Sequence, residues 1–270
     1  MLAFPALSSR PSPIAVIPAV LLIAVATWET CATPRDAAST PRDEAWDRAE
    51  KVVRAGYQPG DLIVFAPDWI DPVGRLHFGD LISVDTAARM DAAKYGRIWE
   101  VSIRDARAPE TAGLKPVATQ SIGGITIRGF IREPVKVLAD VRDALPTMKV
   151  EGPWRPQLEL AEVGFAPHRC IQVVPAANGS VRMTFPQLPL GTQLVGYVGL
   201  ADVFTRRDIR APGKLTVEIG GNQVASVTAG VDDGWVRFSA PTTPGPADVT
   251  FIASATANQR LICFAAEARQ

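Results

Sequence analysis

The C-terminal part of the chain contains many short apolar runs separated by turn residues, and this pattern restricts the fold more than any other feature. Turn-forming sequences such as Asn178-Gly179, Gly220-Gly221 and Pro244-Gly245-Pro246 stand between the runs. Short strands at regular spacing with such turns are typical of an antiparallel β-sandwich, which we expect over residues 153–270. The predicted strands are residues 158–163, 170–174, 181–185, 193–199, 214–219, 223–228, 235–239, 247–253 and 261–265.

The preceding region, residues 41–152, has the alternating pattern of a small α/β domain. Helix, strand, helix and strand at these spacings predict a parallel strand pair. The predicted fold class is therefore α+β, with a small α/β domain followed by a jelly-roll-like sandwich. The expected elements are helices at 41–55 and 85–95, strands at 61–66 and 97–103, and further strands at 125–131 and 135–139 that complete the sheet.

The first 26 residues have the pattern of a secretory signal peptide. Arg10 is the one charged residue before an apolar run from Ile14 to Ile23, and Ala24-Val25-Ala26 follows as a small-residue cleavage pattern. An uncleaved N-terminal anchor and a buried core helix are the alternatives. Residues 27–40 are small and polar and are expected to form a linker. The protein is then periplasmic or extracellular, and it contacts a membrane only through this N-terminal segment if the segment is retained.

Two of the three cysteines open and close the predicted sandwich. Cys170 and Cys263 both lie in strand-like sequence, and the first and last strands of a sandwich often lie near each other. We expect a disulfide between them, and closing a loop of about 90 residues contributes up to ~4–5 kcal/mol in the chain-entropy model. The alternative is two independent buried thiols. Cys31 is left over in the leader, and the cysteine spacings fit no zinc pattern.

Composition and missing motifs exclude several classes of function. Lys+Arg and Asp+Glu both number 28, so the chain lacks the basic excess of a nucleic-acid-binding protein. A hydrophobic content of 47% excludes wholesale disorder. The sequence has no P-loop, no G-x-G-x-x-G, no G-x-S-x-G and no H-E-x-x-H. We therefore expect no cofactor, no metal and no nucleic-acid partner, and these observations favour a function without catalysis.

One candidate site follows the first predicted strand, in the sequence Asp68-Trp69-Ile70-Asp71. Ligands of open α/β units bind beyond the carboxyl ends of the strands, so a site is expected there. Asp68 and Asp71 are candidates for acid–base groups or for cation ligands, Trp69 for a stacking face, and His77 lies nearby in the sequence. The alternative is a solvated turn whose acids cap backbone amides.

A second candidate site surrounds Trp235 in the sandwich. A Trp at a strand edge beside acids and Arg suits a sugar, because the ring stacks on apolar sugar faces while the polar groups bind hydroxyls. The alternative is a Trp that closes the core. The basic loop that contains Arg206 and Arg207 could bind anionic polysaccharide or lipid headgroups. The alternative is a solvated loop with no binding role. The candidate binding residues are Trp235, Asp232, Asp233, Arg237, Arg206 and Arg207.

Two parts of the chain resemble known families. The C-terminal block, with Gly234-Trp-Val-Arg-Phe238 and Cys263-Phe-Ala-Ala-Glu-Ala-Arg269, resembles the galactose-binding-like jelly-roll sandwiches of bacterial carbohydrate-active proteins. The stretch Gly56–Pro67 with Arg97–Val101 resembles the extracytoplasmic soluble region of bacterial polytopic membrane glycosyltransferases. The second resemblance does not extend to the multi-span membrane part that carries that family's catalytic acids.

These observations lead to one leading hypothesis and two alternatives. The leading hypothesis is an exported envelope protein that serves as a non-catalytic saccharide- or protein-binding accessory module. The first alternative is an extracytoplasmic enzyme that acts on glycans or glycolipids through Asp68 and Asp71. The second is a structural subunit of an envelope assembly. The position of Trp235, open beside a groove or buried, is expected to separate binding from a structural role.

Overall fold

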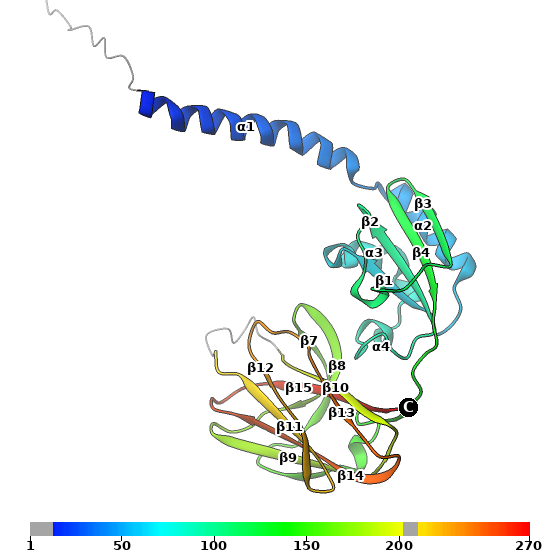
Figure 1. Cartoon of the computed structure of the whole chain (residues 1–270), viewed down its shortest axis with the longest axis vertical. Helices are drawn as coiled ribbons and strands as arrows, with labels where there is room; N and C mark the ends of the chain where they lie inside the picture. The colour runs from blue at the N-terminus through cyan, green and yellow to red at the C-terminus, as the bar shows by residue number, and fades with distance from the viewer. Residues whose placement is uncertain (1–12, 202–209) are drawn as a thin grey trace, which may run out of the picture.

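The computed structural model describes residues 13–201 and 210–270, with the backbone alone at 13–16 and 33–39. The chain forms a long N-terminal helix, a small α/β domain and a β-sandwich (Figure 1). The sandwich consists of antiparallel strand ladders, which confirms the predicted fold class.

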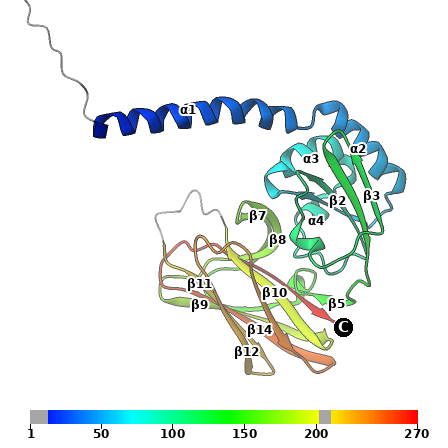
Figure 2. The ribbon, with the colours of Figure 1, turned by 45° about the horizontal axis from the view of Figure 1, so that its top comes forward.

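Helix α1 (Pro13–Ser39) extends away from both domains in both views (Figures 1 and 2). It is continuous through residues 27–39, so the segment predicted as a linker is helical in the structure. Several of its apolar side chains are exposed, among them Leu22 and Trp28. Within the described ranges, no helix is both long and apolar enough to cross a membrane.

The α/β domain is built on a four-stranded sheet. Helix α2 (Asp43–Gly56) packs Trp46 and Val53 against one face, where they meet Phe65 and Ile127. The strands are β1 (Leu62–Ala66), β2 (Arg97–Ile103), β3 (Ala118–Ile122) and β4 (Ile125–Ile131), in the order β1-β2-β4-β3. Strands β1 and β2 are parallel, as predicted, and the other pairs are antiparallel.

The connection from β1 to β2 contains short elements rather than one helix. The 3₁₀-helix η1 (Asp68–Ile70), helix α3 (Asp71–Phe78) and 3₁₀-helix η2 (Gly79–Leu81) follow β1. Helix α4 (Val84–Ala87) is only four residues long, so the predicted helix at 85–95 was wrong. The chain leaves the helix because the carbonyls of residues 88–90 accept hydrogen bonds from the sandwich instead of from the next helical turn.

The sandwich has two facing sheets. One sheet has the order β13-β10-β15-β8-β7, with β5 also paired to β15, and the other has the order β12-β11-β14-β9-β6. The ranges are β5 (Val137–Asp140), β6 (Lys149–Glu151), β7 (Gln157–Val163), β8 (Ala166–Val173), β9 (Gly179–Leu190), β10 (Gln193–Leu200), β11 (Gly213–Ile219), β12 (Asn222–Ala229), β13 (Val236–Pro241), β14 (Gly245–Ala255) and β15 (Ile262–Arg269).

Strands β5 and β6 belong to the sandwich and not to the α/β sheet. Ala139 pairs with Ala268, and Val150 pairs with Met183. The sandwich sheets therefore include residues from 137 onward, earlier than the predicted start at 153. The expectation that residues 135–139 complete the α/β sheet was wrong, because a short strand pattern does not specify its partner.

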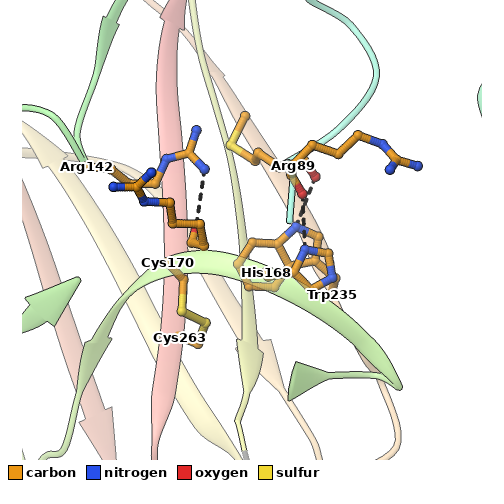
Figure 3. The surroundings of a disulfide bond; sticks show 8 residues. Arg89, Arg142, His168, Cys170, Trp235 and Cys263 are labelled. Atoms are coloured by element: carbon orange, nitrogen blue, oxygen red, sulfur yellow. Dashed lines mark hydrogen bonds between the residues drawn. A yellow bond between two sulfur atoms is a disulfide. The ribbon is translucent and has the colours of Figure 1, made fainter. Parts of the chain in front are cut away.

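The sandwich core and its disulfide lie on different faces of the β15 sheet. Phe185, Phe251 and Phe264 fill the space between the sheets. Cys170 and Cys263 form the expected disulfide on neighbouring strands (Figure 3), with their Cα atoms 5.5 Å apart. The two cysteines belong to a separate cluster that includes Val163 and Ala201. Cys31 is a free, exposed thiol on α1.

Candidate functional site

The α/β domain docks on the sandwich through the segment of residues 88–91, hereafter the docking segment. The backbone N–H of Arg169 donates to the Ala88 carbonyl at 3.0 Å. His168 Nδ1 donates to the Arg89 carbonyl at 3.2 Å, and Trp235 Nε1 donates to the Met90 carbonyl at 3.1 Å (Figure 3). Three consecutive carbonyls of one domain are thus bound by donors of the other.

Trp235 lies in the middle of a stack of three rings at this junction. Its ring is 4.4 Å from the His168 ring and 5.9 Å from the Tyr197 ring, with interplanar angles of 14° and 8°. Trp235 is half-buried and does not line the cleft described below. The structure therefore gives this residue a role in holding the two domains together.

An ion cluster completes the junction. Arg269, which is buried, donates to the Asp91 carboxylate at 2.9 Å and to the Glu267 carboxylate at 2.7 Å. The Tyr197 hydroxyl also donates to Asp91, at 3.3 Å. Burial alone would raise the pKa of Asp91, but the hydrogen bonds from Arg269 and the Ala93 N–H outweigh it, so the pKa is lowered. Asp91 is therefore a stable anion at neutral pH.

His168 is neutral in this environment. Burial opposes the charged imidazolium and lowers the pKa of His168 to about 4, and the positive charges of Arg89 and Arg142 act in the same direction. The Arg89 carbonyl can only accept, so the proton of the neutral ring is on Nδ1.

A cleft of about 1030 Å³ lies where the two domains meet beside the docking segment. One wall comes from η1 and α3, and the other from the β7–β8 hairpin. Both α4 and β8 lie at this junction in the two ribbon views (Figures 1 and 2). The lining residues with polar, charged or aromatic side chains are Phe65, Asp68, Trp69, Asp71, Arg75, Arg89, Asp91, Glu110, Arg132, Phe165, His168 and Tyr197.

The α/β wall holds two of the sequence candidates. Asp68 and Asp71 both line the cleft, directly after β1 as the sequence predicted for such a site. Asp71 is paired with Arg75 at 2.6 Å. Within the described part of the chain, the Asp68 carboxylate has no hydrogen-bond or ion-pair partner. Trp69 is 63% exposed, with the Arg104 guanidinium 6.0 Å from its ring centroid.

His77, the third candidate near this wall, lies elsewhere. It stacks on Trp46 at 5.8 Å and its Nδ1 is 3.0 Å from Asp47, and it does not line the cleft. The structure therefore does not bring His77 to Asp68 and Asp71. Among the described side chains, no group of three or more His, Cys, Asp or Glu residues is arranged to hold a metal ion.

The other described candidates of the sandwich lie outside the cleft. Asp233 accepts from the Gly230 N–H at 2.7 Å, and Arg237 contacts Ser239 at 3.3 Å. Asp232 lies 3.7 Å from Arg210, and none of these residues lines the cleft. Arg206 and Arg207 lie outside the described residues.

Several cleft residues were missed by sequence reasoning. Arg89 pairs with Glu110 across the cleft lining, and Arg132 donates to the Tyr95 carbonyl at 2.9 Å. Phe165 is 80% exposed at the tip of the β7–β8 hairpin. The sequence does indicate that this position is unusual. A two-residue hairpin loop favours Gly, Asn or Asp at both positions, and here the second position is Phe.

The fold and the cleft together define a two-domain protein with a ligand-sized cleft between an α/β unit and a β-sandwich. No protein-family model matches the sequence. No curated protein matches it either. No family is therefore assigned to this chain.

Similar solved structures include carbohydrate-binding modules. CBM51 from Clostridium perfringens GH95 in complex with methyl-galactose is 8% identical, covering 44% of this chain and 92% of that chain with a TM-score of 0.34. CBM51-2 in complex with GlcNAc and the INT domains from Clostridium perfringens ZmpB is 11% identical, covering 62% and 42% with a TM-score of 0.39. The C-terminal CBM6 of LamC from Zobellia galactanivorans is 10% identical, covering 44% and 90% with a TM-score of 0.30. At these scores the likeness says nothing about what this chain binds.

Proposed function

We propose that this protein is an exported, non-catalytic module that binds a saccharide in the cleft between its two domains. The observation that carries the proposal is an exposed Trp69 ring beside the Asp68 carboxylate, which is unpartnered among the residues that the structure describes, in a cleft of about 1030 Å³. An aromatic ring stacks on the apolar face of a sugar, and a carboxylate accepts hydrogen bonds from its hydroxyls.

The other polar groups of the cleft favour an uncharged ligand. Asp71 is neutralised by Arg75, and Glu110 by Arg89. Each carboxylate and guanidinium in such a pair still has sites for hydroxyl groups, because a carboxylate offers about four lone-pair positions and a guanidinium five N–H donors. Paired side chains are also held in place before binding, which reduces the entropy lost on association. A hydroxyl-rich neutral molecule fits this arrangement.

The proposed location rests on two independent features. The Cys170–Cys263 disulfide is typical of oxidising compartments such as the periplasm or the exterior. The N-terminal 26 residues have the composition of a secretory signal. Together they support export, with the mature protein either released or attached to the membrane by its N-terminal segment.

The test is a glycan-array screen of the purified full-length protein, followed by calorimetric titration. Trp69→Ala removes the stacking face, and we expect it to weaken binding at least about tenfold, as for the loss of a central aromatic contact. The matched control is Trp154→Ala, because Trp154 is 59% exposed and does not line the cleft. Absence of glycan binding by the wild type, or equal loss in both variants, would contradict the proposal.

A second function, glycan turnover, is favoured by the position of Asp68 and Asp71 in the same cleft. Two carboxylates in one cleft can serve as acid and base in glycosidic-bond cleavage. The measurement is release of reducing ends from array-positive glycans by the wild type and by Asp68→Ala and Asp71→Ala. Equal release by all three proteins, or none by the wild type, eliminates this function.

A further inference from the structure

Helix α3 and the η1 turn before it carry an apolar stripe on the side that faces away from the core. The stripe consists of Trp69, Pro72, Val73 and Leu76, whose spacing of three or four residues places them on one side of the helix. All four are exposed, with Trp69 at 63%, Val73 at 42% and Leu76 at 81%. The opposite side of the helix, which includes Phe78, packs on the core.

This distribution is unusual for a helix at the surface of a domain. The outward side of such a helix normally carries charged and polar residues. In α3 the charged pair of Asp71 and Arg75, 2.6 Å apart, lies beside the stripe and not within it. Single exposed apolar residues are common and need no explanation, whereas several adjacent ones mark a surface that contacts an apolar partner.

The stripe begins inside the cleft and continues beyond it. Trp69 and Pro72 line the cleft, whereas Val73 and Leu76 do not. At a helical rise of 1.5 Å per residue, the stripe is about 10 Å long from Trp69 to Leu76. A molecule held against Trp69 can therefore extend out of the cleft along the stripe.

The size and the chemistry of the stripe indicate what part of a ligand it contacts. A stable protein–protein interface uses about 20–30 residues on each side, and the stripe has only four. A sugar ring needs hydrogen-bonding groups, which the side chains of Val73 and Leu76 lack. A hydrocarbon chain needs none, because removing its methylene groups from water against apolar side chains is favourable in itself.

We propose that the saccharide in the cleft is the headgroup of a glycolipid and that the stripe contacts the part of the hydrocarbon chain next to the sugar. This inference rests on the proposed function and names its ligand class. The sugar lies against Trp69 and Asp68 inside the cleft, and the chain leaves the cleft over Val73 and Leu76. The polar lining and the apolar stripe thus bind the two chemically different parts of one molecule.

The test compares each saccharide with and without an alkyl chain. The probes are the methyl and octyl β-glycosides of glucose, galactose, N-acetylglucosamine and the best array-positive glycan, titrated calorimetrically into the full chain below their critical micelle concentrations. The informative variant is Leu76→Gln, which removes the apolar end of the stripe, keeps a good helix former and lies outside the cleft. The matched control is Leu160→Gln, because Leu160 is 57% exposed on β7 and does not line the cleft.

The expected results separate the chain from the sugar. The wild type binds the octyl glycoside of a recognised sugar at least about tenfold more tightly than the methyl glycoside, because methylene groups are buried on the stripe. Leu76→Gln binds the methyl glycoside like the wild type and loses most of the octyl gain. Leu160→Gln keeps the whole gain. All three proteins have similar melting temperatures, because both substitutions are at exposed positions.

Several outcomes would overturn the inference and leave the proposed function intact. Equal affinity of the wild type for methyl and octyl glycosides is one, and an undiminished octyl gain in Leu76→Gln is another. Dimers of the wild type that Leu76→Gln abolishes in sedimentation velocity would assign the stripe to a second copy of the chain. Wild-type binding to phosphatidylcholine vesicles without glycolipid, lost in Leu76→Gln, would assign it to the bilayer surface.

The failure of the proposed function is recognised separately. If the wild type bound no methyl glycoside and no arrayed glycan, the proposed function and this inference would both fail, whatever the octyl probes did.

Discussion

At the scale of single residues, His168 and Trp235 connect the two domains by donating hydrogen bonds to backbone carbonyls of the docking segment. Asp68 and Asp71 reach the cleft because they directly follow a buried strand. Trp235 was weighed as a sugar platform or a core residue, and it is instead a docking donor. Its acceptor, the Met90 carbonyl, is 145 residues away in the sequence, so no local pattern indicates the contact.

His168 gives a prediction at this scale. Its pKa is lowered to about 4 in the folded protein, from about 6.5 in an unfolded chain. Between these values the unfolded chain binds more protons, so this contribution to stability is fully present above pH 6.5 and is lost as the pH falls towards 4. We expect the free energy of unfolding of the wild type to fall over this range.

The variant His168→Asn separates this residue from other titrating groups. Its amide can still donate to the Arg89 carbonyl but does not titrate, so the decrease in unfolding free energy from pH 6.5 to pH 4 should be smaller than in the wild type. Urea unfolding followed by tryptophan fluorescence at several pH values provides the measurement. Identical pH profiles for the two proteins would show that His168 is not the responsible group.

At the scale of secondary-structure elements, the strands of the sandwich were predictable because alternating burial gives each of them a local signature. Strand β9 is an example, because buried side chains alternate with partly exposed ones from Val181 to Phe185. What the pattern lacks is the identity of the partner, which is why β5 was predicted in the wrong sheet. The prediction of a helix at 85–95 was wrong for a related reason. The carbonyls of the docking segment accept hydrogen bonds from the sandwich, and a local sequence pattern does not indicate such distant donors.

The docking segment can be tested through its Trp235 donor. Trp235→Phe keeps an aromatic ring between His168 and Tyr197 but leaves the Met90 carbonyl without its donor. We expect a loss of roughly 1–3 kcal/mol of unfolding free energy, the cost of an unsatisfied buried acceptor. Trp235→Ala, which also removes the stack, should lose more. Chemical denaturation measures both values.

The control for this pair is Trp154→Phe, which changes an exposed Trp that has no role in docking. We expect it to change the unfolding free energy by less than about 0.5 kcal/mol, as for surface substitutions in general. A Trp235→Phe protein as stable as this control would mean that the hydrogen bond to the docking segment contributes nothing.

At the scale of the whole molecule, the sequence predicted two domains and a disulfide but not the surface formed between them. The cleft uses η1 and α3 from one domain and the β7–β8 hairpin from the other. These segments are about 90 residues apart in the sequence, and their meeting depends on the ring stack and on the Asp91–Arg269 ion pair. A site of this kind is visible only after the domains are docked.

The central claim is that the cleft between the domains is where a saccharide binds. The most direct measurement is calorimetric titration of an array-positive glycan into the double variant Asp68→Ala/Trp69→Ala, with circular dichroism to verify that it is folded. The account predicts no measurable binding by the folded double variant. Wild-type affinity in that protein would place the binding site elsewhere and contradict the account.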